Sequence, residues 1–170
     1  MNLKEVKQLL ESDTLTVQKD RINTTNKYDG YKFVGTSPEV IPDTVTNGDI
    51  IKVYYVRDTF GYTVEYYFNN VKDETLTENK TALYNEQITS YTDKVKAGYK
   101  LGNEENLPLT ITENAINNVI RIFYVTDEAQ TKELSYTVEY YKDGVIADTE
   151  VKSIVVQVLE PNVLEVDKAA

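Results

Sequence analysis

The chain has 170 residues, and its 28 acidic and 18 basic side chains give a net charge of −10 and a pI near 4.6. Such a charge repels phosphate backbones and anionic lipid, which argues against nucleic acid and direct membrane binding. Cysteine and histidine are absent from the sequence, which excludes thiol nucleophiles, imidazole bases and Cys/His metal sites. No apolar run is long enough to span a membrane.

Tyrosine is frequent, with 14 copies, half of which stand directly beside valine or another aromatic residue. These residues favour β-strands, so we predict a mostly β (α+β) fold with mixed sheet. In chain order, the apolar spacing of residues 3–10 taken alone predicts a short amphipathic helix. The matching residues 154–159 are β-branched and favour a strand, so a strand is the first prediction for this segment and the helix is the alternative. Strands are then predicted over residues 15–17, 31–34 and 51–56.

One hexapeptide occurs twice and defines where the repeat units of the chain begin. The sequence YTVEYY occupies residues 62–67 and returns unchanged at residues 136–141. An unchanged repeat of β-forming residues indicates two copies of one structural unit. In the first copy, strand alternation places Val64 and Tyr66 on one face and Tyr67 on the opposite face.

A second pair of segments marks where each unit ends. Residues 51–58 (IKVYYVRD) align with residues 120–127 (IRIFYVTD), and a Gly-Tyr-Lys step precedes each, at residues 30–32 and 98–100. A unit therefore runs from YTVEYY through a hairpin and this step to a closing strand. Within the unit, the spacing of apolar residues predicts one short helix over residues 85–94.

The two ends of the chain also align, because residues 157–168 match residues 8–19. The chain thus reads as one period of a two-unit array, entered in the middle of the first unit, which we name repeat A; the other unit is repeat B. We predict the closing part of repeat A at residues 1–58, a complete repeat B at 59–127, a linker at 128–135 and the opening part of the next repeat A at 136–170.

Repeat B resembles the MucBP-type (mucin-binding protein) repeats of Gram-positive surface proteins. The resemblance rests on the order of YTVEYY, a hairpin, Gly98-Tyr99-Lys100 and the closing strand at residues 120–125, and the split repeat A is similar. Internalin-type B-repeats share the same fold class and are a near competitor. The resemblance implies tandem small β-grasp, ubiquitin-like units with at most one short helix each.

The resemblance also implies a function and a location. It implies a non-enzymatic, extracellular module of a bacterial cell-surface adhesin or stalk, attached to the cell wall through its parent protein. The residues at 1–6 lack the apolar core of a signal peptide, so an exported protein would need this chain to be part of a longer one. The alternatives are a purely structural spacer without a ligand, or an accessory domain of a carbohydrate-active enzyme.

Four aromatic residues are the candidate contact surface for mucin or another host glycan. If the opening and closing strands are neighbours, their outward rings form a patch able to stack on sugars. These residues are Tyr54, Tyr67, Phe123 and Tyr141. The competing interpretation is cross-strand aromatic pairing, which stabilises a sheet by about 0.2–1 kcal/mol per pair.

No catalytic, cofactor or metal site is predicted. The acidic pairs Asp73-Glu74 and Glu104-Glu105 lack the alternating spacing of a calcium loop, which favours solvated surface. A phosphate-binding glycine loop and a nucleophile elbow are both absent from the sequence.

Splitting repeat A leaves a sheet edge uncovered on each half. The halves can close within one chain, or the tail of one molecule can dock on the head of the next. We expect either the second, a head-to-tail self-association, or frayed ends, because repeat B separates the halves and the connections are short.

Overall fold

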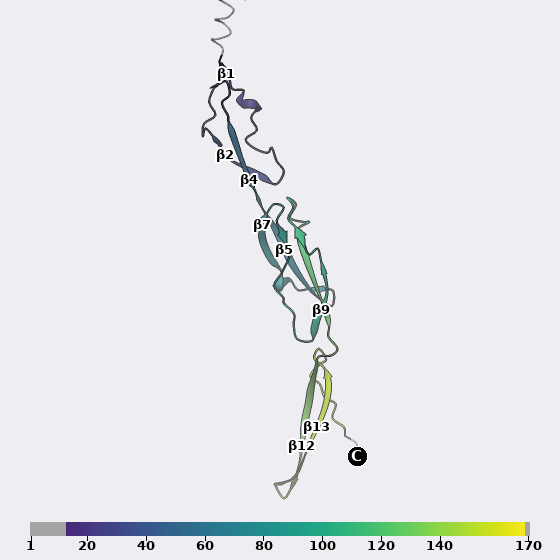
Figure 1. Cartoon of the computed structure of the whole chain (residues 1–170). Helices are drawn as coiled ribbons and strands as arrows, with labels where there is room; N and C mark the ends of the chain where they lie inside the picture. The colour runs from purple at the N-terminus through teal and green to yellow at the C-terminus, as the bar shows by residue number, and fades with distance from the viewer. Residues whose placement is uncertain (1–12, 169–170) are drawn as a thin grey trace, which may run out of the picture. The chain divides into compact units, whose positions relative to one another are not determined.

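The computed structural model describes residues 13–168 (Figure 1). The fold is mostly β with mixed sheets, as predicted, and the described residues contain two short 3₁₀ turns and no α-helix. The strand or helix predicted at residues 3–10 lies outside the described residues.

The elements follow one another along the chain with short connections. The strands are β1 (Thr14–Thr16), β2 (Tyr31–Ser37), β3 (Thr44–Thr46), β4 (Lys52–Arg57), β5 (Thr59–Phe68), β6 (Val71–Lys72), β7 (Glu78–Leu83), β8 (Gln87–Ile88), β9 (Tyr99–Glu105), β10 (Leu109–Thr110), β11 (Val119–Thr126), β12 (Thr131–Lys142) and β13 (Val145–Gln157). The 3₁₀ turns are η1 (Lys19–Arg21) and η2 (Glu74–Leu76).

Contacts between Cα atoms divide the chain into two compact units. Among the described residues, unit 1 consists of 13–62, 80–88 and 110–118, and unit 2 of 63–79, 89–109 and 119–168. The predicted repeat B at 59–127 contributes residues to both units, and β5 runs from one into the other.

The largest sheet has five strands in the order β6-β5-β11-β9, with β7 also paired to β5. Its centre is the parallel pair β5 and β11, in which Val119 lies opposite Thr63 and Tyr124 opposite Phe68. The strands β6 and β9 are antiparallel to their neighbours, so the sheet is mixed. The YTVEYY sequence therefore lies in the middle of a sheet in its first copy.

Alternation along β5 and β11 decides which side chains are buried. The buried side chains are Val64, Tyr66 and Phe68 of β5 and Ile120, Ile122 and Tyr124 of β11. A loop between β8 and β9 is tied to this face: the Tyr66 hydroxyl donates to the Thr92 carbonyl at 2.7 Å, and the Lys94 amide donates to the Tyr124 hydroxyl at 2.9 Å. The predicted face for Val64 and Tyr66 is thus the buried face.

The short helix predicted over residues 85–94 is wrong. Residues 87–88 form β8, which pairs with β10. The Asn85 amide donates to the Ile111 carbonyl at 3.0 Å, and the Ile111 amide donates to the Glu86 carbonyl at 2.9 Å. Asn85 also has a φ of 60°, outside the helical region. Hydrogen bonds to a distant segment have replaced the local ones that a helix needs.

Two antiparallel ladders repeat one register. In unit 1, Tyr31 of β2 lies opposite Arg57 of β4; in unit 2, Tyr99 of β9 lies opposite Thr126 of β11. Both ladders also shift register partway along, and each shift falls at the same place in the aligned sequences. The Gly-Tyr-Lys steps and closing strands therefore form the same local structure twice.

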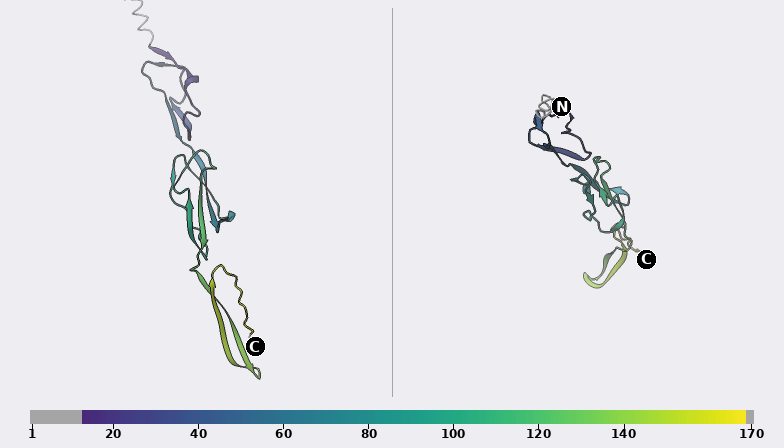
Figure 2. Two further views of the ribbon diagram at one scale, coloured as in Figure 1. Left: turned by 90° about the vertical axis from the view of Figure 1, so that its right-hand side faces the viewer. Right: turned by 45° about the horizontal axis from the view of Figure 1, so that its top comes forward.

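The second YTVEYY copy lies in a long hairpin, in which β12 has β13 as its only strand partner among residues 13–168 (Figure 2). The strand β12 begins at Thr131, so residues 131–135 are strand and not part of a linker at 128–135. The reason is that these residues face residues 153–157 of β13, with Lys132 and Leu134 half-buried. The shorter connection consists of residues 127–130.

The first Gly-Tyr-Lys step needs its glycine for two reasons. Gly30 has a φ of +75°, which L side chains rarely adopt. A Cβ atom at this position would lie 2.2 Å from Cγ of the Tyr84 ring, which packs against Tyr31 and Phe60. The Gly30 carbonyl also accepts a bond from the Asp58 amide at 2.8 Å. A ring atom so near its backbone cannot move aside.

We predict that Gly30→Ala destabilises the fold more than Gly48→Ala. Gly48 has a φ of +93° and open space around its Cα, so its replacement costs about 1 kcal/mol of backbone strain. The Gly30 variant adds overpacking and should lose about 2–4 kcal/mol. Equal losses in urea unfolding monitored by circular dichroism would contradict the packing of Tyr84 on Gly30.

Asn118 is the buried polar side chain of unit 1, with no exposed surface. Its amide nitrogen donates to the Gly61 carbonyl at 3.1 Å and to the Thr112 carbonyl at 2.7 Å, and its oxygen accepts from the Thr112 amide at 2.9 Å. One side chain therefore joins three chain segments by satisfying their backbone groups.

We expect Asn118→Ala to lower the free energy of unfolding by about 2–3 kcal/mol, because it leaves buried backbone groups without partners. The matched change at the exposed Asn162 should have an effect within about 0.5 kcal/mol. Thermal unfolding of both variants provides the comparison, and a neutral Asn118 variant would refute this role.

Candidate interaction surface

The structure brings together two of the four predicted aromatic residues. Tyr67 and Phe123 lie opposite each other in the parallel ladder of β5 and β11. Their ring centroids are 4.8 Å apart and their planes differ by 22°, so the rings are stacked on each other. They occupy the sheet face opposite Tyr66 and Ile122, because adjacent strand residues point to opposite faces. The stack matches the interpretation of cross-strand pairing.

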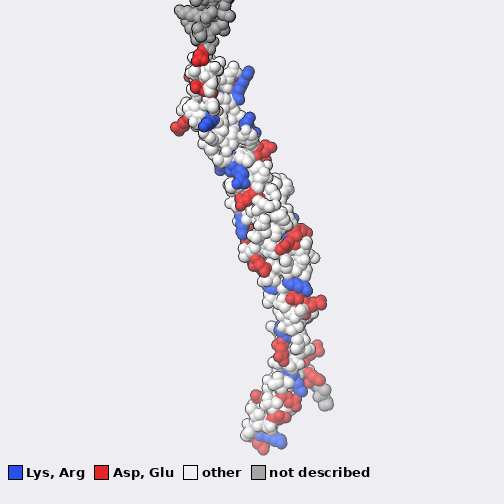
Figure 3. All heavy atoms as spheres, in the orientation of Figure 1, with Lys and Arg blue, Asp and Glu red and all other residues white. Residues whose placement is uncertain are grey.

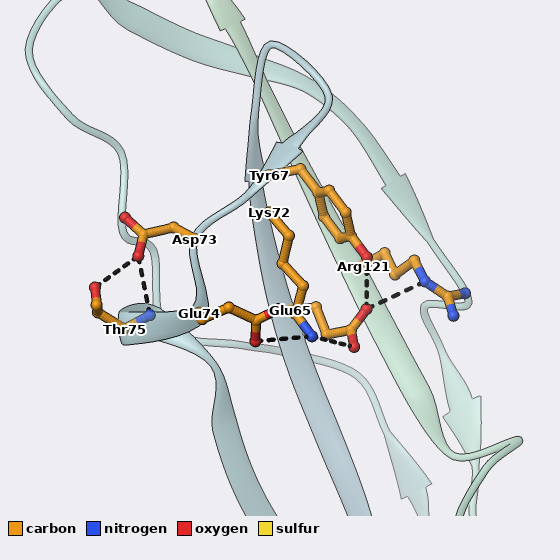
Figure 4. A network of polar contacts seen from close by, with 7 residues as sticks. All are labelled: Glu65, Tyr67, Lys72, Asp73, Glu74, Thr75 and Arg121. Carbon is orange, nitrogen blue, oxygen red and sulfur yellow. Dashed lines mark hydrogen bonds and ion pairs between the residues drawn. The ribbon is translucent and has the colours of Figure 1, made fainter.

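Glu65 is the centre of a polar network beside this stack (Figure 4). Its carboxylate accepts a hydrogen bond from the Tyr67 hydroxyl at 2.8 Å and from the Lys72 ammonium at 2.9 Å. The Arg121 guanidinium lies 3.3 Å from the same group. Three strands thus contribute one partner each to a single side chain.

The environment of Glu65 favours its charged form. Burial alone raises the pKa of this carboxyl group, but the hydrogen bonds from Lys72 and Tyr67, together with the charges of Lys72 and Arg121, more than offset this and lower the pKa. The pKa of Tyr67 is raised by burial and by its bond to Glu65. Glu65 is therefore held as an ion-paired carboxylate, which is not the state of a general acid.

The acidic pair Asp73-Glu74 continues this network. Lys72 also lies 3.2 Å from Glu74, and Asp73 caps the 3₁₀ turn η2 through Thr75 (Figure 4). Asp73 also pairs with Lys96 at 2.6 Å. Hydrogen bonds from Lys96 and Thr75 lower the pKa of Asp73 to about 2. These acids have cationic partners and a capping role.

The other acidic pair, Glu104-Glu105, lies on the exposed surface, as predicted. The Glu104 carboxylate accepts a hydrogen bond from the Tyr91 hydroxyl at 2.6 Å. Burial and this bond raise the pKa of Tyr91. On the face shown in Figure 3, acidic and basic side chains are interspersed along the described surface.

A shallow groove of about 430 Å³ adjoins one edge of the aromatic stack in unit 2. Phe123 and Val125 of β11 and Gly102, Asn103 and Glu105 of β9 line it, together with Asn70. Tyr67 does not line the groove; its ring packs on Phe123 and its hydroxyl donates to Glu65. Only one ring of the pair is therefore available to a ligand here.

Tyr54 borders a separate cavity of about 440 Å³ in unit 1. Val53 and Tyr55 of β4 also line it, together with Tyr28 and Tyr31. Tyr28 was missed as a site residue because it precedes the Gly-Tyr-Lys step in a polar stretch without strand alternation. The signal that points to it is its place two residues before Gly30.

Tyr141 lies on β12 and is exposed. Its hydroxyl donates to Glu139 at 2.7 Å, the same local bond that joins Tyr67 to Glu65. Within the described residues, no ring contact joins Tyr54 or Tyr141 to the Tyr67–Phe123 pair. The four predicted residues therefore do not form one patch in this structure.

Within residues 13–168, no group of three or more acidic, histidine or cysteine residues is arranged to hold a metal ion. No helix in this range has the length and apolar character that crossing a membrane requires. No family model matches the chain, and neither a curated protein nor a solved structure is significantly similar to it.

We predict a pH-dependent effect of Glu65→Gln. The folded-state pKa of Glu65 lies below its ordinary value of 4.5, so its stabilisation is present above that pH and is lost as pH falls through the folded-state pKa. The variant should lose about 1 kcal/mol of unfolding free energy at pH 7 and much less at pH 3.

The matched control is Glu139→Gln, which removes the equivalent carboxylate from the exposed hairpin. Denaturant unfolding at both pH values should show almost no change for this variant. A Glu65 effect that is the same at pH 3 and pH 7 would contradict a charge-based role.

Proposed function

We propose that this chain is a non-enzymatic β-sheet module of a bacterial cell-surface protein, and that its main role is that of a structural spacer. The observation that carries this proposal is that the side chains on one face of β5 and β11 bond to and stack on one another. Tyr67 and Phe123 stack on each other, and Glu65 is bonded to three partners from its own sheet. Groups that already satisfy one another stabilise a module and leave little chemistry for a substrate.

The proposed location, outside the cell and attached to the wall through a parent protein, rests on the resemblance of YTVEYY, the Gly-Tyr-Lys step and the closing strand to MucBP-type repeats. Internal duplication of these segments is the arrangement expected of a spacer, since stacked units extend a protein by repetition. Antibodies against this chain should label intact source cells, and external protease should remove the label.

Adhesion to mucin or another glycan is the second candidate function. Two observations favour it: the groove of about 430 Å³ beside Phe123 and the cavity of about 440 Å³ beside Tyr54. Both volumes fall within the range of about 300–1,000 Å³ that small-ligand sites occupy, and aromatic rings give sugars an apolar surface. Each site has at least one aromatic wall.

A glycan array and a mucin pull-down with the full chain separate the two functions. The spacer proposal predicts no saturable binding. Saturable binding that disappears in Phe123→Ala or Tyr54→Ala would overturn it in favour of adhesion. Val40→Ala is the control, because Val40 is an exposed apolar residue that lines neither site.

A further inference from the structure

Two strands of this chain have an unpaired edge that their sequence counterparts do not have. The strand β11 has β9 on one side and β5 on the other, whereas β4, which aligns with β11, pairs only with β2. Likewise β5 has partners on both edges, whereas β12 pairs only with β13. These pairings cover the described residues, 13–168.

The complete pair β5–β11 shows what would cover each open edge. Transferring its register through the aligned sequences gives six opposed residue pairs between parallel β12 and β4. The opposed residues are Thr137 with Ile50, Val138 with Ile51, Glu139 with Lys52, Tyr140 with Val53, Tyr141 with Tyr54, and Lys142 with Tyr55.

Residues of β4 and β12 are more exposed than their counterparts in β11 and β5, as expected where a neighbouring strand is missing. Tyr66 is 0% exposed, whereas its counterpart Tyr140 in the same hexapeptide is 48% exposed. Tyr54 and Tyr141, the counterparts of the stacked Phe123 and Tyr67, are 46% and 56% exposed. Identical or similar side chains are therefore covered in one copy and open in the other.

Charge complementarity supports the same register. In the complete pair, Arg121 lies 3.3 Å from Glu65. The counterparts are Lys52, which is exposed and has no ion-pair partner among the described residues, and Glu139. Glu139 accepts a hydrogen bond from the Tyr141 hydroxyl at 2.7 Å, the same local bond that Glu65 accepts from Tyr67 in the complete pair.

The cavity beside Tyr54 has the composition of an uncovered core. Two of its walls, Val53 and Tyr55, are counterparts of Ile122 and Tyr124, which are buried in the complete pair. Because Tyr66 lies opposite Ile122 in that pair, its counterpart Tyr140 would lie opposite Val53, at this cavity.

We propose that β4 of one chain takes β12 of a second copy of the chain as its parallel neighbour, in the register that joins β11 to β5. This interaction surface is independent of the proposed function. Chain length favours a second copy: residues 127–130 after β11 reach at most about 14 Å. To lie parallel to β4 of its own chain, β12 would have to return past the length of β5, about 33 Å.

A charge-reversal experiment with the full chain tests the register. Sedimentation velocity over a concentration series should show reversible head-to-tail association. Lys52→Glu and Glu139→Lys should each weaken it about tenfold, and the double variant should restore it. Glu133→Lys makes the same charge change on β12 outside the six opposed pairs, and it should leave association unchanged.

Disulfide trapping tests the partner, because the chain has no cysteine of its own. Mixing a Tyr54→Cys chain with a Tyr141→Cys chain should give a cross-linked heterodimer, since directly opposed residues of neighbouring strands meet the Cα distance of a disulfide. Tyr54→Cys mixed with Ser135→Cys, which is out of register, should cross-link far more slowly.

Three outcomes would overturn the proposal. The first is a monomer at every concentration, with equal trapping in and out of register. The second is a chain carrying both cysteines that forms its bond within the monomer. The third is that the Tyr141→Cys chain alone forms a disulfide-linked dimer faster than the mixture does. That result would mean that two β12 strands pair with each other. Circular dichroism of each variant confirms that the sheet is intact.

Discussion

The parallel pairing of β5 with β11 is the constraint on which the rest of the structure depends. It joins segments that are far apart in the sequence, and its register decides which side chains meet. Tyr66 and Ile122 are buried, Tyr67 stacks on Phe123, and Glu65 reaches Arg121 only because these residues are opposed. A slip of one residue would move each side chain to the other face and would break the stack, the ion pair and the core together.

The two open strands show how much of this depends on the partner. The hexapeptide YTVEYY has a buried tyrosine in β5 and an exposed one in β12, although the local sequence is the same. This contrast connects the two proposals. As a spacer, the chain stabilises itself through satisfied sheet contacts; as a self-associating chain, it repeats the same contacts between copies. The cavity beside Tyr54 then has two competing explanations: it binds a glycan, or it receives the Tyr140 side chain of a second copy. The two explanations differ in the chemistry of the occupant.

The success of sequence reasoning depended on whether a feature was local. Alternation placed Val64 and Tyr66 on the buried face, since period-two patterning follows from strand geometry alone. The helix predicted at residues 85–94 was wrong because Asn85 and Glu86 bond to Ile111, a partner that no local spacing reveals. The predicted linker was too long for the same reason: Thr131 and its neighbours become strand by pairing with β13. Tyr67 and Phe123 were predicted to form one patch on the condition that their strands are neighbours. Only the tertiary structure could meet that condition.

The sequence by itself determined the mostly β fold, the internal duplication and the alternation of faces, because these depend on residue type and on spacing along the chain. The tertiary structure decided that β5 and β11 are parallel neighbours, that Glu65 is ion-paired, and that β4 and β12 each keep one edge free within the described residues. The physical reason is that burial and electrostatic pairing belong to the strand opposite a residue, and a residue's own sequence neighbours do not specify that strand.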